Sequence, residues 1–341
     1  MYTVKFYLQL LPFINVKRLI NLIKLFISML ISFIIKHPVV WGKPYTIFIE
    51  PTGFCNLKCP ECVVGSAMLN RPKGNMSFPE FKRLIDEVKD HVFMLFLYFQ
   101  GEPFINKEIH KMITYAAAQN IFIITSTNGH FFNTDEKAQK AVESGIHYII
   151  VSMDGATEES YTKYRRGGNL DIVLEGIKRI IDYRKTIKSK YPQVAIQFLV
   201  MKENETEIPL LNTMAENLGV DSVLLKSLQV YHTEEMESLL PTNEKYRRYE
   251  FKDGKWQLKG KYYNFCTKLW VGSVISWESK MFPCCFDKDG DHLNADLTNG
   301  SFAEIWKGRE LQSFRKQVLT DRQQIDICRN CSEGQKIFHI L

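Results

Sequence analysis

The sequence predicts an α/β protein that is built on a parallel β-sheet and located in the reducing cytoplasm, and three observations lead to these predictions. The chain has 341 residues, of which 45% are hydrophobic, enough for a sizeable core. Between residues 44 and 227, short apolar runs alternate with runs of helical periodicity, as in βαβ units. The eight cysteines form two groups, unlike those of a small disulfide-rich protein, so the reducing cytoplasm is the expected location. The strand pattern allows either a doubly wound sheet or a partial barrel.

The elements of this alternating region follow from its periodicity. The predicted strands cover residues 45–50, 94–100, 121–125, 148–152, 193–200 and 222–227. The predicted helices cover residues 78–89, 107–119, 135–143, 171–190 and 205–218. Further along, we expect a linker or solvated helical connection at 228–262, an apolar hairpin at 271–281 and a Trp-containing helix around 302–315. Functional residues of such sheets gather at the C-terminal ends of the strands.

The first 49 residues carry six basic residues and no acidic one, whereas the rest of the chain has equal numbers of both. Nothing in this distribution calls for a nucleic-acid partner. Residues 15–36 predict an amphipathic helix with polar residues at 17, 21, 24, 28, 32 and 36. Its longest uncharged run is 11 residues, and a bilayer span needs about 20. Two placements stay open: peripheral contact with the inner face of the membrane, basic stripe toward the headgroups, or a cap on the core.

Three cysteines, Cys55, Cys59 and Cys62, form a Cys-x3-Cys-x2-Cys triplet just past the first predicted strand. A [4Fe-4S] cluster normally takes four cysteine ligands, so three thiolates leave one iron open to a small molecule. A structural zinc site would need a fourth ligand, and none follows closely. Buried thiols without a ligand are the other alternative, but this loop is rich in polar and turn-forming residues.

The triplet resembles the signature of the radical S-adenosylmethionine (SAM) superfamily. The resemblance implies a (β/α)6 partial TIM barrel, with Cys55, Cys59 and Cys62 holding the cluster and the methionine end of SAM chelating the open iron. It also implies reductive cleavage of SAM to a 5′-deoxyadenosyl radical that removes a hydrogen atom from a C–H bond. Glu61 departs from the family pattern, in which the residue before the last cysteine is often aromatic.

The predicted strand ends carry further motifs similar to those of the superfamily. Gly101 and Glu102 resemble the end of its Gly-Gly-Glu motif, with Gln100 in place of the first Gly, and would meet the amino group of SAM. Asn128 and Ser152 resemble its contacts to the ribose and the methionine carboxylate. Arg165 resembles an Arg that pairs with that carboxylate. The alternatives are an ordinary turn at Gly101 and Glu102, and a solvent-exposed Arg165.

A second set of cysteines lies near the C-terminus. Cys266, Cys284, Cys328 and Cys331 make a complete four-thiolate set, which suits a second cluster or a zinc ion. Their order resembles the SPASM/Twitch extension of radical SAM enzymes in its smaller form, which implies one auxiliary [4Fe-4S] cluster. Cys285 would then be a spare thiol.

These observations predict three parts: an N-terminal helix at 1–43, a radical SAM core at 44–250 and an auxiliary-cluster domain at 251–341. We expect an enzyme that abstracts hydrogen from a small-molecule or envelope-linked substrate, in a net oxidation assisted by the auxiliary cluster. A ribosomal peptide maturase and a non-catalytic electron carrier are the alternatives. An electron donor such as flavodoxin or ferredoxin is the expected partner.

Overall fold

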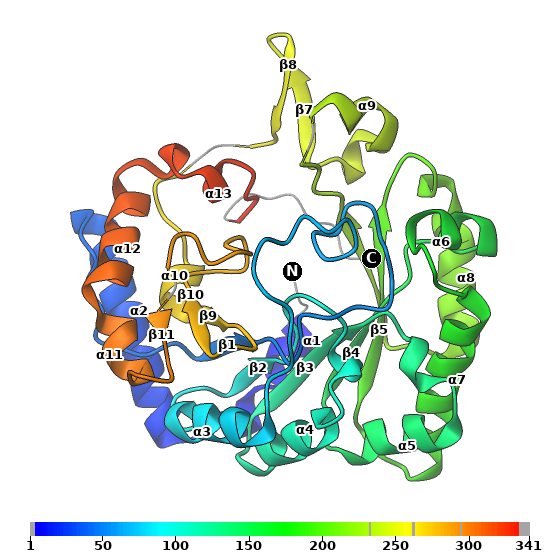
Figure 1. The fold of residues 1–341 in the computed structure, drawn as a ribbon, viewed down its shortest axis with the longest axis horizontal. Coiled ribbons are helices and arrows are strands. Elements are labelled where there is room, and N and C mark those ends of the chain that lie inside the picture. The colour runs from blue at the N-terminus through cyan, green and yellow to red at the C-terminus, as the bar shows by residue number, and fades with distance from the viewer. Residues whose placement is uncertain (1–3, 232, 261–262, 294, 334–341) are drawn as a thin grey trace.

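Six parallel strands form the central sheet of the computed structural model, which describes residues 4–231, 233–260, 263–293 and 295–333. Each strand pairs in parallel with the next, and the sheet curves as in Figure 1. They are β1 (Thr46–Ile49), β2 (Met94–Phe96), β3 (Phe122–Thr127), β4 (Tyr148–Ser152), β5 (Gln193–Val200) and β6 (Ser222–Ser227). All six predicted strands are confirmed, three of them to the residue.

Helices cover the outer side of the sheet (Figure 1). They are α3 (Phe78–Val88), α4 (Ile109–Ala118), α5 (Asp135–Glu143), α6 (Glu158–Tyr164), α7 (Leu170–Thr186) and α8 (Ile208–Leu218). The five predicted helices are confirmed, and α6 is an addition. Alternate residues of each strand face opposite sides: Ile47 and Ile49 pack under the helices, while Phe48 stacks on Phe96 at 4.3 Å between ring centroids on the inner side.

The C-terminal part extends the same sheet rather than standing apart from it. Strand β9 (Gly272–Ile275) pairs in parallel with β1, and β10 (Lys280–Phe282) and β11 (Ala295–Asp296) follow in antiparallel pairs. The predicted hairpin is therefore confirmed. Its partner, β1, lies more than 220 residues earlier in the chain.

Two predictions for the C-terminal third are corrected. The polar stretch at 228–262 contains a β-hairpin, β7 (Tyr249–Lys252) and β8 (Lys255–Leu258), besides the short helix α9 (Met236–Leu239). Asp253 and Gly254 turn it with φ of 52° and 74°, and Asp-Gly is a strong hairpin signal. The helix expected around 302–315 is two helices, α11 (Phe302–Lys307) and α12 (Arg309–Asp321), separated by extended backbone at Gly308.

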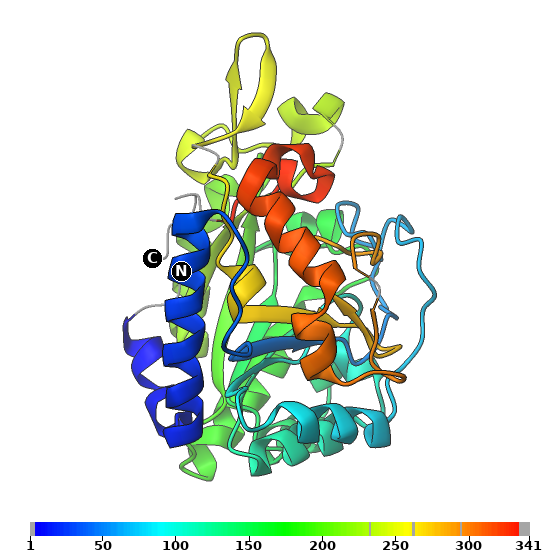
Figure 2. The ribbon, with the colours of Figure 1, turned by 90° about the vertical axis from the view of Figure 1, so that its left-hand side faces the viewer.

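The N-terminal segment forms α1 (Val4–Leu8), the 3-10 turn Leu11–Phe13 and α2 (Val16–Ile35), which confirms the predicted helix. Phe6 and Phe13 pack edge-on against Phe122, on the inner side of the sheet. Helix α2 runs along the outside of the molecule (Figure 2). By length and composition this 20-residue helix could cross a bilayer, with a mean hydropathy of 2.0 over an 18-residue window, which the longest uncharged run alone did not indicate.

Candidate active site

The triplet Cys55, Cys59 and Cys62 lies on the loop that leaves β1 at its C-terminal end. Cys59 is buried, the other two are half-buried, and all three thiols are free. The loop turns tightly: the Cys62 amide donates to the Cys59 carbonyl at 3.2 Å, and a Cβ on Gly65 would lie 2.5 Å from the Cys59 backbone. The three thiols are therefore presented by one short, close-packed loop.

A buried ion pair anchors this loop. The Arg71 guanidinium donates two hydrogen bonds to the Glu50 carboxylate, one of them 2.7 Å long. Both side chains are at most 5% exposed. Arg71 Nε also donates to the Lys288 carbonyl at 2.7 Å, and the Trp277 amide donates to Glu50 at 3.2 Å. The pair thus joins the triplet loop to the C-terminal part. Sequence reasoning missed it, because a lone Glu after a strand and a distant Arg carry no spacing signal.

Gly101 lets the loop after β2 approach the triplet loop. Its φ is +76°, and a Cβ there would lie 2.4 Å from the Thr52 carbonyl oxygen and 2.7 Å from that of Phe54. The next amide, that of Glu102, donates to the Phe54 carbonyl at 2.7 Å. A side chain at position 101 would therefore separate the two loops.

Glu102 is buried and its carboxylate faces the end of β3. It accepts hydrogen bonds from Thr127 Oγ1 at 2.8 Å, the Asn128 amide at 2.7 Å and the Phe104 amide at 3.2 Å. Burial raises the pKa of Glu102 to about 7, against the lowering effect of these donors. The residue therefore has a structural role in joining β2 to β3, and its contact with the amino group of SAM stays a prediction.

Asn128 and Ser152 end neighbouring strands, as predicted, and both are buried. The side-chain Nδ2 of Asn128 donates to Asn56 Oδ1 at 2.8 Å, which ties the end of β3 to the triplet loop. Ser152 Oγ lies 3.4 Å from Ser126 Oγ across β3 and β4. Asn56 is a site neighbour that sequence reasoning did not single out.

Arg165 follows α6 and reaches back to the triplet. Its guanidinium forms an ion pair with Asp154 and lies 3.9 Å from Cys59 Sγ. Burial alone would lower the pKa of Arg165, but Asp154 and then Cys59 raise it above its ordinary value, so the side chain is cationic. Its buried Nε has no hydrogen-bond partner among the described residues, which suits an incoming carboxylate. The solvent-exposed alternative for Arg165 is wrong, since its side chain is 15% exposed.

The C-terminal thiols come together from three separate segments. Cys328 and Cys331 are buried, and Cys266, Cys284 and Cys285 are half-buried. Burial raises the pKa of Cys266 to about 12 and that of Cys331 to about 11. A thiol in such surroundings stays protonated unless a cation or metal compensates for the burial.

Arg322 supplies one such cation. It is buried, donates to the carbonyls of Phe265 at 3.3 Å and Glu333 at 3.0 Å, and interacts electrostatically with Cys266, Cys328 and Cys331. Like Arg165 beside Cys59, it favours thiolates over thiols. The charge environment of both cysteine sets therefore fits anionic ligands of an iron-sulfur cluster.

The ligand assignments themselves stay predictions. Within the described ranges, no three side chains of His, Cys, Asp or Glu converge on a single metal ion. Cys284 and Cys285 both lie near Cys331, so the choice between them also stays open.

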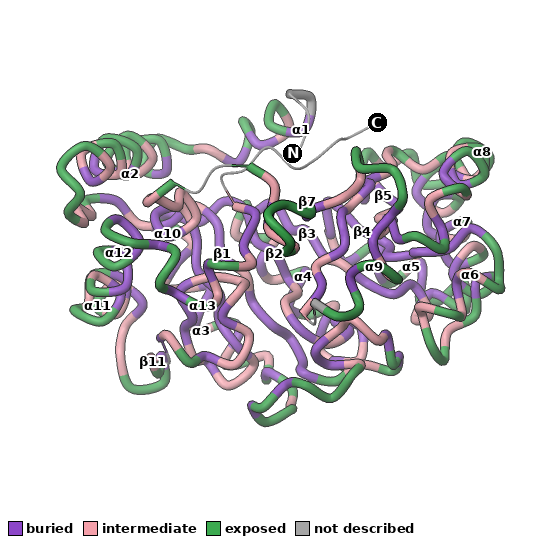
Figure 3. The backbone as a smooth tube through the Cα atoms, turned by 90° about the horizontal axis from the view of Figure 1, so that it is seen from above, coloured by how far each residue is buried: buried purple, intermediate pink, exposed green. Residues whose placement is uncertain are grey.

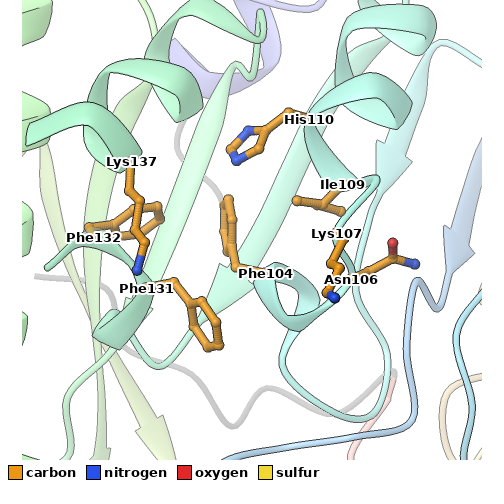
Figure 4. Close-up of a pocket in the computed structure, with 8 residues that line it drawn as sticks. All are labelled: Phe104, Asn106, Lys107, Ile109, His110, Phe131, Phe132 and Lys137. Carbon is orange, nitrogen blue, oxygen red and sulfur yellow. The ribbon is translucent and has the colours of Figure 1, made fainter. Parts of the chain in front are cut away.

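Two cavities lie beside these groups, and a third is lined by none of them. One of about 530 Å³ flanks the triplet loop and is lined by Asn56, Lys58, Pro60, Gly65, Ser66, Arg166 and Gly167. An apolar one of about 300 Å³ extends from Phe6 and Tyr7, past Phe48 and Phe96, to Cys284 and Cys285. A third, of about 130 Å³, lies between Phe104, His110 and Phe132 (Figure 4). The third is smaller than typical ligand pockets, which begin at about 300 Å³.

Comparison with known proteins decides the family. The sequence profile of the radical SAM superfamily matches residues 49–212, and that of the SPASM iron-sulfur cluster-binding domain matches residues 266–332. The chain belongs to the radical SAM superfamily. Its cofactors are SAM and the [4Fe-4S] cluster that binds SAM, and its SPASM domain binds an auxiliary iron-sulfur cluster. The non-catalytic carrier alternative is thereby set aside, since these are enzymes.

Individual relatives of this radical SAM enzyme are distant in sequence. One is the "tungsten-containing aldehyde ferredoxin oxidoreductase cofactor-modifying protein" of Pyrococcus furiosus, 22% identical over 84% of this chain and 86% of the relative. Another is the mycofactocin maturase MftC of Mycobacterium tuberculosis, 24% identical over 84% and 75%. SuiB of Streptococcus suis, solved with S-adenosylmethionine, superposes with a TM-score of 0.61 at 15% identity, over 81% of this chain and 68% of SuiB. This likeness supports the predicted partial TIM barrel.

Proposed function

We propose that this radical SAM enzyme removes a hydrogen atom from a C–H bond of a small or envelope-linked substrate, in a net oxidation. The observation that carries the proposal is the meeting of the triplet loop with the ends of β2, β3 and β4. There, Glu102 bonds to Phe54, Asn128 bonds to Asn56, and Arg165 touches Cys59.

In this proposal, Cys55, Cys59 and Cys62 hold the SAM-binding cluster, and Cys266, Cys284, Cys328 and Cys331 hold the auxiliary one. When bound, these groups supply the reductive cleavage of SAM, the hydrogen abstraction and an acceptor for the electron that an oxidation releases. The unpaired Nε of Arg165 binds the carboxylate of SAM, while Gly101, Glu102, Asn128 and Ser152 line the rest of its site. A flavodoxin or ferredoxin delivers the electron.

The substrate class rests on the apolar cavity of about 300 Å³ that ends at Cys284 and Cys285. Apart from the ion pair of Lys268 and Glu333, its lining is mostly aromatic and aliphatic, which suits an apolar group. A peptide substrate is the second candidate, because SuiB has been solved with its precursor peptide SuiA. The cytoplasmic location and the contact with the inner membrane face belong to the same proposal.

The test is anaerobic reconstitution of the full chain followed by reduction in the presence of SAM. Two complete thiolate sets should hold about eight irons and eight sulfides per chain. Reduction should then yield 5′-deoxyadenosine and methionine in equal amounts. The Cys285→Ala variant should retain both results, because Cys284 is the ligand in this proposal, and loss of about half the iron in it would assign the ligand to Cys285 instead. Zinc as the metal of the C-terminal set would contradict the auxiliary cluster, and intact SAM in the loaded protein would contradict the activity.

A further inference from the structure

The outward face of the N-terminal segment is unusually apolar. In the described part of the chain, 13 of the 20 exposed large hydrophobic residues precede residue 42. Nine of them lie on α2 and are 45 to 73% exposed, among them Ile23, Ile27, Leu30 and Ile34. Figure 3 shows α2 at one margin of the molecule with exposed residues along it. A patch of this kind marks an interaction surface.

The uncharged polar residues of α2 face the protein instead. Ser28 and Ser32 are fully buried, and Ser32 bonds both the amide and the carbonyl of Val39 at 2.8 and 3.0 Å. Asn21 makes the same pair of bonds with Lys43, each 2.8 Å long. A helix on the surface of a water-soluble protein has the reverse arrangement. The predicted orientation, with the whole polar stripe toward lipid headgroups, is therefore wrong for Asn21, Ser28 and Ser32, whereas Lys17 and Lys24 of the same stripe are exposed.

Arg18 locks the helix in this orientation. Its guanidinium is 1% exposed and donates to four carbonyls, those of Phe13, Lys89, Gln119 and Asn120, at 2.6 to 3.2 Å. Three of these carbonyls lie at the C-terminal ends of α3 and α4, where helical carbonyls lack internal partners. Releasing α2 into a membrane-spanning position would break all of these bonds.

The charges of α2 itself have one sign. Lys17 and Lys24 are exposed and, being seven residues apart, share one edge of α2. Lys17 lies 3.4 Å from Asp90, an exposed residue of the neighbouring α3 end, and no acidic residue occurs before Glu50. Anionic lipid headgroups attract such basic residues.

We infer that α2, with the adjoining turn, docks flat on an anionic phospholipid bilayer, its apolar face among the acyl chains and its buried face held to the barrel. The apolar exposure, the single charge sign and the locked orientation all suit an interfacial helix. Docking also brings the half-exposed Tyr7, which lines the apolar cavity, to the lipid surface. The inference concerns binding and stands independently of the proposed reaction.

Vesicle flotation of the full chain tests it, with phosphatidylcholine vesicles compared with vesicles that also contain phosphatidylglycerol. We expect binding to the anionic vesicles that weakens in high salt. The Ile23→Glu, Ile27→Glu, Leu30→Glu triple variant should lower the partition coefficient at least tenfold. The matched control places the same change at exposed apolar positions elsewhere, Ile172, Ile187 and Leu210, and should bind as the parent does. Both variants should keep the parent's thermal midpoint, because the changed side chains are exposed.

Three outcomes would overturn the inference. One is a full chain that stays in the soluble fraction with both kinds of vesicle. Another is a self-associating chain that the triple variant renders monomeric without any vesicle binding, which would assign the face to a second copy. The third is membrane association that survives carbonate extraction, which would show a spanning helix.

Discussion

The two cysteine sets differ in how the chain brings their thiols together. The triplet spans eight residues of one loop, so its geometry depends mostly on local turns such as that at Gly65. The C-terminal set spans 66 residues and comes from the start of α10 (Lys268–Val271), the end of β10 and the short helix α13 (Asp326–Arg329). Its geometry therefore depends on the packing of a whole domain.

The two cysteine sets also share one feature. Each set has a buried arginine beside it, Arg165 at the triplet and Arg322 at the C-terminal set. The ion pair of Glu50 and Arg71 connects the two sets. Arg71 bonds Glu50 beside the triplet loop and also the carbonyl of Lys288, four residues past Cys284. Each cysteine set thus has its own arginine, and one ion pair connects the two sets. Variants can test these two properties separately.

The largest expected effect is on iron content and activity. Changing Cys55, Cys59 and Cys62 together to Ala should remove about half the iron, from about eight to about four per chain, and all SAM cleavage. The C-terminal set should keep its cluster, because no residue of the triplet belongs to it. Iron and sulfide analysis with 5′-deoxyadenosine assay measures both. Loss of all the iron would show that the two sets do not load independently.

The next effect is on stability, through the link between the sets. Arg71→Ala leaves the Glu50 carboxylate buried without its partner, which typically costs about 3 to 5 kcal/mol. Urea denaturation measures the change. Arg83→Ala is the control: Arg83 pairs with Glu80 while 36% exposed, so its loss should cost less than about 1 kcal/mol. Equal costs for the two variants would contradict the role of the buried pair.

Acid pH should destabilise the fold even in the apoprotein, through two buried histidines. Burial lowers the pKa values of His91 and His147 to about 4, below the ordinary 6.5. A lowered folded-state pKa stabilises the fold above pH 6.5, and this stability is lost as the pH falls toward 4. Each histidine should contribute roughly 3 kcal/mol over that window. His91→Gln should remove the contribution of His91 from the pH dependence of unfolding in the apoprotein, whereas an unchanged dependence would contradict this origin.

The smallest expected effect is on SAM affinity. Ser152→Ala should weaken SAM binding by about 1 to 3 kcal/mol without shifting the thermal midpoint, because among the described residues the Ser152 hydroxyl makes only one long contact, to Ser126. Glu102→Ala should weaken SAM binding too, but also lower the midpoint, since three buried donors lose their acceptor. Calorimetric titration and thermal denaturation measure the two effects. Ser126→Ala serves as the control and should bind SAM as the parent does. If Ser152→Ala and Glu102→Ala also bind SAM with the parent's affinity, these two residues do not belong to the SAM site.

Much of the fold follows from the sequence alone. Alternating apolar and helical periodicity depends on local burial, so it located all six parallel strands and five of the helices around them. Cysteine spacing likewise pointed to the triplet, because a loop of eight residues is a local structure. The Asp253-Gly254 dipeptide is also a hairpin signal in the sequence, but the polar residues around it favoured the prediction of a linker.

Other features depend on contacts between distant residues, which no local pattern records. Only the tertiary structure placed β9 beside β1, paired Glu50 with Arg71 and used Glu102 to join two strand ends. It also turned the uncharged polar residues of α2 inward, because Arg18 found carbonyl partners at the ends of α3 and α4, and Asn21 and Ser32 found partners in the segment 39–43 after the helix. The sequence by itself determined which segments are amphipathic and where the first thiols lie. Which face of α2 is buried was decided by those partners, since a buried polar group is stable only where its hydrogen bonds are made.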